Sequence, residues 1–262
     1  MSTVNAPLRL VSNPISHYCE KARWALDRAG VPYEEEFHLP IFSRFAAKRA
    51  VGTPTVPALS GNGLKLGESG DILRWVDAQL AESARWLSGV GEEQSGLEAF
   101  VERFDLELGP HVRRWCFDQV LPDPELAASL FEECGPAWER RLLRWTYPVA
   151  AGFLKKSLKV SPEGVQRSTA KIDACLEAAE ARLAEGRRYL VAERLTAADI
   201  GLAVFLAPIV MPSEHPSDYV TYEAVPEAYR RRCDELRARP AGAHALRVYA
   251  EHRTERAPRL DD

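Results

Sequence analysis

Cysteine is scarce in this sequence, and its distribution excludes a disulfide framework. The five cysteines are odd in number and scattered along 262 residues, whereas a disulfide-stapled fold needs pairs at short, regular spacings. No two of them have the spacing of a zinc site, and the six histidines are equally dispersed. We therefore expect a cytoplasmic protein with reduced thiols and no bound metal.

Long apolar runs and a large excess of one charge are also absent. The longest apolar run, at residues 200–211, contains a proline and is too short to span a membrane. Residues 1–7 lack the basic and apolar regions of a signal peptide. The formal net charge is −4, from 34 basic and 38 acidic side chains. This balance argues against nucleic acid or an anionic membrane as the main partner.

Apolar residues make up 46% of the chain, enough for a sizeable core, and strand and helix signals alternate over its first 80 or so residues. Strands are expected at residues 8–11, 34–39, 56–60 and 64–66, the last two joined by the hairpin-turn signal Gly61-Asn62-Gly63. Helices are expected at 16–29 and 68–80, with a short helix or loop at 42–49. This order predicts a small mixed sheet covered by helices.

From about residue 96 onward the signals are almost all helical. Helices are expected at residues 97–108, 124–134, 138–158, 164–185, 196–207 and 225–239. Residues 86–95 are interpreted as a linker, and the tail from Thr254 is expected to fray. The proline-rich stretch 118–165 is expected to form several short helices.

The most informative segment is Ser16-His17-Tyr18-Cys19, directly before an amphipathic helix. A helix N-terminus presents unpaired N–H groups and a partial positive charge, which stabilise an anion such as a thiolate. Capping alone also explains Ser16, and a small buried residue explains Cys19. Both explanations are open at this point.

A second motif, Val56-Pro57, precedes the third expected strand. Because proline is disfavoured in a central strand, Pro57 is expected at the strand's first position or in a turn. A cis bond there would leave the N–H and C=O of Val56 available to a ligand. An ordinary loop with a trans bond is the alternative.

A third motif, Glu68-Ser69, opens a helix. The free N–H groups of the helix can hold a carboxylate, and Glu68 can hold an ammonium group. The site would therefore suit the α-amino acid end of a ligand. A capped helix with an acidic first turn is again the simpler explanation.

Together with a capping box at Thr196 and Asp199, which we interpret as structural, these motifs resemble those of the soluble, cytosolic glutathione S-transferase superfamily in its serine-type, bacterial-like form. The resemblance implies an α/β thioredoxin-like, glutathione-binding domain at residues 6–82. It also implies an all-α helical domain at residues 94–252. Members of the family are usually homodimers, so a homodimer is expected.

The resemblance also implies roles for the residues of these motifs. Ser16 would be the catalytic residue, donating a hydrogen bond to the sulfur of glutathione. Val56 and Pro57 would bind the cysteinyl backbone of glutathione, and Glu68 and Ser69 its γ-glutamyl end. The candidate cations for its glycyl carboxylate are Arg44, Lys48 and Arg49.

The second substrate, a small hydrophobic electrophile, is expected between the two domains. The candidates for an apolar wall are Trp115, Phe117, Trp145 and Tyr147. A place in the core or at a dimer interface explains these four residues at least as well. The stretch 118–165 could cover this electrophile site.

The leading interpretation is a transferase that conjugates the glutathione thiolate to such an electrophile, a detoxification reaction. One alternative is glutathione-dependent thiol–disulfide exchange through Cys19. The sequence argues against it, because redox relatives have their attacking thiol at the position of Ser16, which here carries a hydroxyl. Another is a non-catalytic binding or scaffold protein. The presence of Val56-Pro57 and Glu68-Ser69 favours a working glutathione site.

Overall fold

The computed structural model describes residues 7–130, 135–217 and 221–260. The chain divides into two compact units, and each draws on more than one stretch of sequence. The first unit comprises Met1–Ala84, Leu130–Thr146 and Thr254–Asp262, and the second comprises Arg85–Ser129 and Tyr147–Arg253.

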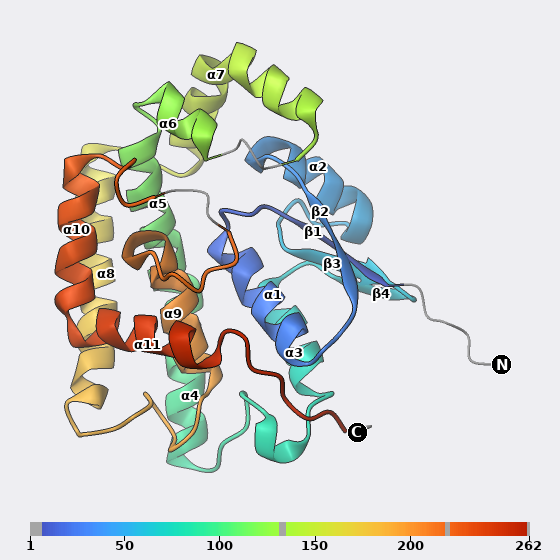
Figure 1. Ribbon diagram of the computed structural model, residues 1–262, viewed down its shortest axis with the longest axis vertical. Coiled ribbons are helices and arrows are strands. Elements are labelled where there is room, and N and C mark those ends of the chain that lie inside the picture. The colour runs from blue at the N-terminus through green and yellow to red at the C-terminus, as the bar shows by residue number, and fades with distance from the viewer. Residues whose placement is uncertain (1–6, 131–134, 218–220, 261–262) are drawn as a thin grey trace. The chain divides into compact units, whose positions relative to one another are not determined.

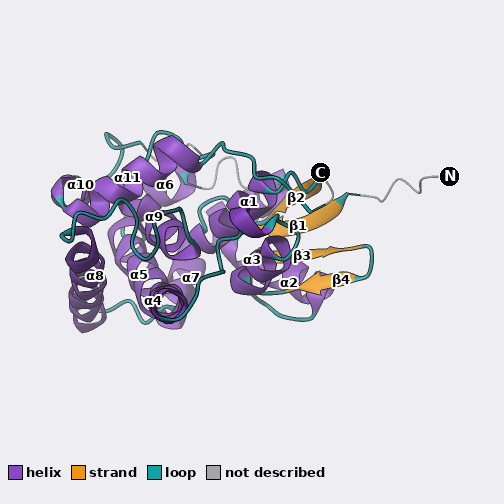
Figure 2. Ribbon diagram, turned by 90° about the horizontal axis from the view of Figure 1, so that it is seen from below, coloured by secondary structure: helices purple, strands orange, loops and turns teal. Residues whose placement is uncertain are grey.

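The first unit contains a four-stranded mixed sheet with strand order β2-β1-β3-β4 (Figure 2). The strands are β1 Leu8–Ser12, β2 Tyr33–Phe37, β3 Ala58–Gly61 and β4 Leu64–Leu66. Strand β1 pairs parallel with β2 and antiparallel with β3, which forms a hairpin with β4. Asn62 and Gly63 have φ values of 50° and 83°, as the expected tight hairpin turn requires.

Helices cover this sheet, as the fold class predicts. They are α1 His17–Arg28, α2 Pro40–Val51 and α3 Ser69–Asp77, followed by the short η1 Glu82–Ala84 (Figure 1). Helix α1 packs against α3, and α2 packs on β1 and β3. Ala47 of α2 lies in a buried cluster with Val11 and Ala58 of the sheet. Leu10, which points to the opposite face of the sheet, is also fully buried.

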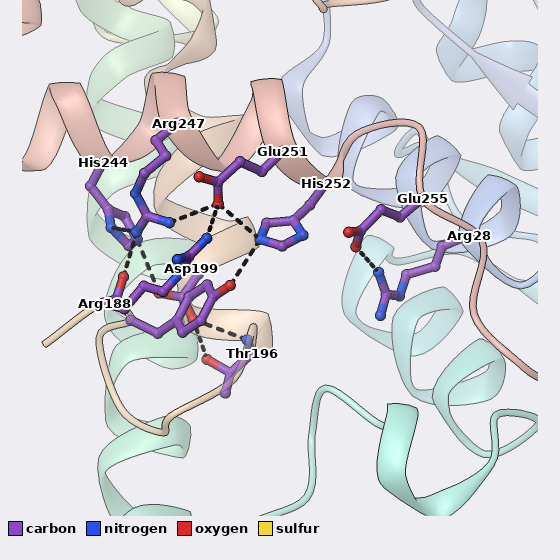
Figure 3. A network of polar contacts seen from close by, with 10 residues as sticks. Arg28, Arg188, Thr196, Asp199, His244, Arg247, Glu251, His252 and Glu255 are labelled. Carbon is purple, nitrogen blue, oxygen red and sulfur yellow. Dashed lines mark hydrogen bonds and ion pairs between the residues drawn. The ribbon is translucent and has the colours of Figure 1, made fainter.

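The tail does not fray over residues 254–260, contrary to the sequence-based expectation. Three backbone hydrogen bonds attach it to the first unit: Ala257 N–H to Arg28, Ala81 N–H to Pro258, and Leu260 N–H to Gln79. Arg28 and Glu255 form an ion pair at 3.0 Å (Figure 3). The tail is ordered by backbone pairing with distant residues, which its polar composition does not reveal. Residues 261–262 lie outside the described part.

The second unit is helical, as predicted. Its elements are α4 Glu92–Arg103, the π-helix η2 Phe104–Leu108, α5 Gly109–Val120, α6 Pro124–Ser129, α7 Ala137–Ser157, α8 Pro162–Leu183, α9 Ala197–Val210, α10 Glu227–Ala238 and α11 Pro240–His252. The first half of α7 is counted with the first unit.

Several expectations about these helices were wrong. Helix α4 begins inside the expected linker, where Trp86 is also buried. Helices α5 and α11 were not foreseen; α11 starts at Pro240, because proline is well tolerated in the first helical position. The stretch 118–165 contains the short α6 and one long helix, α7, of 21 residues, and residues 131–134 lie outside the described part.

Helix α9 forms the centre of the second unit, and a buried carboxylate fixes its N-terminus. Asp199 accepts hydrogen bonds from the N–H of Thr196 (3.0 Å), the hydroxyl of Thr196 (2.7 Å) and the N–H of Leu190 (2.9 Å). Its other contact is His244 of α11, at 3.0 Å (Figure 3). The capping box therefore acts structurally, joining α9 to a loop and to a neighbouring helix.

We expect Asp199→Ala to destabilise the protein by about 3–5 kcal/mol, because it leaves buried N–H groups without an acceptor. The measurement is the free energy of unfolding in urea. The matched control is Ser161→Ala at the N-cap of α8, whose hydroxyl accepts a single bond from Gly164 N–H at 3.1 Å; it should lose about 1 kcal/mol. Equal losses in the two variants would contradict this account.

Candidate functional site

Ser16 lies where the loop after β1 meets α1, and it caps that helix. Its backbone is extended (φ −87°, ψ 114°), and its Oγ accepts the N–H of Cys19 at 3.4 Å. The side chain is partly exposed, and its hydroxyl also lies beside the Cys19 thiol, whose pKa this contact lowers. The hydroxyl is therefore a hydrogen-bond donor at the helix start, on a side chain that solvent still reaches.

A buried guanidinium, that of Arg23, fixes the loop that presents Ser16. Its Nε donates to Glu35 of β2 at 2.7 Å, and its other nitrogens donate to the Asn13 carbonyl at 3.1 Å and to Glu20 at 3.2 Å. Burial alone would lower the pKa of Arg23, but the two carboxylates raise it above its usual value. The cation therefore stays charged and holds β1, α1 and β2 together. The sequence offered no signal for this role.

Asn13 completes the support of the loop. Its side chain accepts the N–H of Ile15 at 3.1 Å and donates to the carbonyl of His38 at 3.0 Å. Its backbone carbonyl accepts the N–H of Ser16 at 3.1 Å. Each of these bonds restrains the path of the chain directly before α1, so the position of the Ser16 hydroxyl is set by the loop and by the helix.

Cys19 lies one turn into α1 and is fully buried. Its sulfur accepts the N–H of Asn13 at 3.5 Å. Burial raises the pKa of the Cys19 thiol, although Arg23 and the Ser16 hydroxyl oppose this shift. The thiol is therefore neutral and enclosed, unlike the reactive cysteines of redox enzymes, which are exposed and acidic.

The peptide bond between Val56 and Pro57 is cis, and β3 begins at the next residue. Pro57 is buried and Val56 is half-buried. Within the described part of the chain, neither the N–H nor the C=O of Val56 makes a hydrogen bond. One residue at the end of the sheet thus offers a donor and an acceptor that no strand uses.

Glu68 and Ser69 start α3 beside the Val56 segment. Glu68 is the N-cap residue and is exposed, Ser69 is buried, and no side chain caps the helix. Thr55 Oγ1 lies 3.2 Å from Glu68 Oε1 and 3.1 Å from the Gly67 carbonyl. A Cβ at Gly67 would meet the hydroxyl of Thr53 at 2.3 Å, so a larger residue at this position would displace the Thr53 side chain. The two motifs form one continuous surface through Thr55.

Three exposed cations lie along α2, which packs on the same sheet. They are Arg44, Lys48 and Arg49. Among the described residues none of the three forms an ion pair. Their charge is therefore available to an anionic ligand.

A carboxylate from far along the chain holds the start of α2. Glu139, in the first turns of α7, accepts the N–H of Leu39 at 3.0 Å and lies 2.5 Å from His38 Nδ1. The other ring nitrogen of His38 lies 2.9 Å from Glu36. The Glu139 side chain is only 1% exposed. The contact is separated by about 100 residues, so no sequence pattern could have predicted it.

Trp115 and Tyr147, the candidates for an electrophile wall, lie in the second unit. Trp115 is buried in α5 and packs edge to face on Tyr229, with ring centroids 4.9 Å apart. Tyr147 is half-buried and donates its hydroxyl to the Leu121 carbonyl at 2.9 Å, and burial raises its pKa. Each side chain thus has a structural partner inside its own unit.

Comparison with family models identifies the chain. Residues 10–84 match the glutathione S-transferase N-terminal domain, and residues 162–241 match the glutathione S-transferase C-terminal domain. The two matched stretches together make up more than half of the sequence. The chain belongs to the glutathione S-transferase superfamily. No curated protein matches it.

Solved structures of this superfamily share the fold. Glutathione S-transferase-I bound with lactoylglutathione is 20% identical, with a TM-score of 0.56 over 93% of this chain and 100% of that one. A Methylobacterium radiotolerans glutathione S-transferase in complex with glutathione sulfonate is 20% identical, with a TM-score of 0.52 over 92% and 95%. Ure2p5 from Phanerochaete chrysosporium, cocrystallized with 1-(S-glutathionyl)-2,4-dinitrobenzene, is 18% identical, with a TM-score of 0.54 over 94% and 95%.

The first prediction from this site concerns the buried cation. Arg23→Gln should destabilise the protein by about 3–5 kcal/mol, because it removes a buried cation that pairs with both Glu20 and Glu35. Urea unfolding measures the loss. The control is Arg74→Gln, which breaks an exposed pair with Asp71 and should change stability by less than about 1 kcal/mol. A small loss in the Arg23 variant would show that the cation does not hold the loop.

The second prediction concerns His38. Burial opposes its protonation, but hydrogen bonds to Glu139 and Glu36 outweigh burial and raise its pKa. Its stabilising effect is therefore complete below the unfolded-state pKa of about 6.5 and is lost as pH rises through the folded-state value. His38→Gln should reduce the free energy of unfolding more at about pH 6 than at about pH 9.

His111 provides a control of opposite sign. Burial and the nearby Arg114 lower its pKa, so its contribution to stability grows as pH rises through the unfolded-state pKa. His111→Gln should therefore cost more stability at the higher pH. If the effect of His38→Gln did not change with pH, protonated His38 would not be what fastens α2 to Glu139.

Proposed function

We propose that this protein is a glutathione transferase that joins the sulfur of glutathione to a carbon atom of a small hydrophobic electrophile. Membership of the superfamily supports the proposal, as do structural relatives that hold glutathione derivatives. The observation that carries it is the position of the Ser16 hydroxyl, a partly exposed donor at the N-terminus of α1.

The proposed chemistry begins with the thiol of bound glutathione. A free thiol has a pKa of about 8.5, and lowering it by two units requires roughly 2.7 kcal/mol of preferential stabilisation of the thiolate. A charge-assisted hydrogen bond from Ser16 contributes about 1.5–3 kcal/mol, and the start of α1 about 0.3–1 kcal/mol more. The thiol proton passes to water, and the thiolate forms the new S–C bond. With an aryl halide, the carbon–halogen bond breaks and the halide ion leaves with the bonding electron pair.

The remaining motifs would hold the tripeptide so that its sulfur reaches Ser16. The free N–H and C=O of Val56, fixed by Pro57, would pair with the cysteinyl backbone as an added strand does. Glu68 would bind the γ-glutamyl ammonium, and the N–H groups that start α3 at Ser69 would bind its carboxylate. Arg44 is our candidate for the glycyl carboxylate.

Trp115 and Tyr147 remain our candidates for contact with the electrophile. Their structural partners keep both rings in fixed positions, which suits a rigid apolar wall. The reaction as proposed requires no metal. A cytoplasmic homodimer is the expected state of the protein by its resemblance to the family.

Thiol–disulfide exchange through Cys19 is the weaker alternative. Attack on a disulfide requires an accessible thiolate, whereas the Cys19 thiol is fully buried and its pKa is raised. A non-catalytic scaffold is the other alternative, and isothermal titration with glutathione tests it directly. Absence of binding at millimolar ligand would overturn the transferase proposal.

For a protein that binds glutathione, we predict that Ser16→Ala lowers kcat/KM with a generic aryl halide by roughly 10- to 100-fold, as the loss of one charge-assisted hydrogen bond implies. The acid limb of the pH profile should move to higher pH by about one to two units. Glutathione affinity at low pH, where the thiol is protonated, should change little.

The matched control is Cys19→Ala, three residues further along the same helix. We expect it to retain conjugation activity in every preparation that is folded by circular dichroism. If activity were lost only in the Cys19 variant, the assignment of Ser16 would be reversed. A disulfide reductase activity that survives Ser16→Ala would favour the redox alternative.

A further inference from the structure

Helix α7 exposes a stripe of large apolar side chains. The stripe, which we call the α7 apolar face, consists of Trp138, Leu142, Trp145, Val149 and Phe153. Half of the large apolar side chains that are exposed within the described residues belong to it. Successive members are three or four residues apart, so they lie on one side of the helix. Trp145 and Val149 are 80% and 77% exposed.

The opposite side of α7 attaches the helix to the protein. Glu139, Ala150 and Ala151 are buried, and the Tyr147 hydroxyl donates to the Leu121 carbonyl. Helix α7 is continuous over 21 residues, although it contains a proline (Figure 1). Trp138, the first member of the stripe, also packs edge to face on Phe42 of α2, with ring centroids 5.2 Å apart. The other four members are exposed on one side of the helix, and contiguous exposed apolar side chains mark an interaction surface.

The charge of α7 differs in sign from that of the whole chain. Its basic residues are Arg140, Arg141, Arg144, Lys155 and Lys156, and its one acidic residue is Glu139. Since Glu139 is buried against His38, the exposed surface of α7 carries no carboxylate of its own. The helix thus has a net charge of +4 (five basic residues less one acidic) in a chain of net charge −4.

The basic side chains border the apolar face. At 3.6 residues per turn, Lys156 falls within the stripe, Arg141 lies beside it, and Arg144 and Lys155 lie further round the helix on the same flank. All four are exposed. Tryptophan, phenylalanine and leucine on one side, with lysine and arginine beside them, are typical of helices that lie in a membrane interface. Long basic side chains can reach phosphate groups while their stems cover apolar surface.

We propose that α7 is a docking surface for an anionic phospholipid bilayer. The helix would lie parallel to the membrane, with its apolar face at the boundary between headgroups and acyl chains and its basic edge against lipid phosphates. This is binding at the surface only: no helix in the described ranges is long and apolar enough to cross a bilayer. The net charge of −4 had argued against an anionic membrane as a partner. That value is an average over the whole chain, and it conceals one basic helix in an otherwise acidic protein.

Charge also decides against a second copy of this chain bound through the same face. Two α7 helices packed face to face would bring together the basic edges of both, with no exposed carboxylate on either helix to neutralise them. Like charges in such an arrangement are destabilising. An anionic lipid surface supplies the missing negative charge.

The test is sedimentation of the full chain with two kinds of vesicle, one of pure phosphatidylcholine and one of phosphatidylcholine mixed with phosphatidylglycerol. We expect binding to the mixed vesicles only, weakened by added salt. Trp145→Ser with Val149→Ser should weaken it by roughly tenfold or more, since two large apolar groups no longer enter the lipid. Arg141→Gln with Arg144→Gln should weaken it by about fivefold for each charge removed.

The matched control is Val90→Ser with Leu106→Ser, which removes two exposed apolar side chains elsewhere and should leave vesicle binding unchanged. Equal unfolding free energies show that each variant is folded. No binding to the mixed vesicles, or equal loss in the control, would overturn the proposal. Sedimentation equilibrium without lipid tests the alternative occupant. If the chain self-associates and Trp145→Ser with Val149→Ser abolishes the association, the face binds a second copy of the chain and the membrane proposal is wrong.

Discussion

The candidate site depends on one buried charge, the guanidinium of Arg23. An arginine in this position is costly to desolvate, and its contacts offset that cost only because each is made with good geometry. Its three acceptors come from the β1–α1 loop, from α1 itself and from β2. These are the elements that determine where Ser16 lies. A shift of the loop would break at least one of the buried hydrogen bonds of the Arg23 cation. The cost of that break keeps the loop, and with it the Ser16 hydroxyl, in place.

The first unit is completed by segments that are distant in sequence. Glu139 supplies a carboxylate at the N-terminus of α2, where Leu39 caps the helix without a side-chain bond of its own. A negative group at that end is favoured by the helix dipole as well as by the hydrogen bond. Residues 254–260 similarly pair with the backbone near α1 and α3. The thioredoxin-like unit therefore cannot be cut from the chain at residue 84 without losing contacts that position α2.

The sequence predicted those parts of the fold and of the candidate site that are encoded within a few residues. The cap at Ser16, the turn at Gly61-Asn62-Gly63 and the capping box at Thr196 and Asp199 each depend on neighbours along the chain, and each is present. The bond before Pro57 could be predicted only in part. The proline showed where a cis bond could occur, but only the structure determined that the bond is cis.

The features that the sequence did not predict depend on contacts across the fold. A polar tail carries no local signal that it will pair with Gln79 and Arg28. The last helix expected from the sequence ends at residue 239, whereas Pro240 begins another helix, because the missing N–H of proline costs nothing in the first turn. The buried ion pairs of Arg23 and Glu139 join residues that no periodicity relates. Tertiary contacts override or extend local preference at each of these places.

Ser16 and Cys19 lie within one turn of the same helix N-terminus, but they differ in their exposure to solvent. The partial positive charge of α1 favours an anion at its N-terminus, yet burial raises the pKa of the Cys19 thiol. The reason is position: the sulfur of Cys19 lies one turn inside the helix, where removal from water outweighs one long bond from Asn13 N–H. Ser16 lies at the end of the helix, partly exposed, with a proton to donate. In the proposed function, the thiolate at this helix start is therefore that of bound glutathione and not that of Cys19.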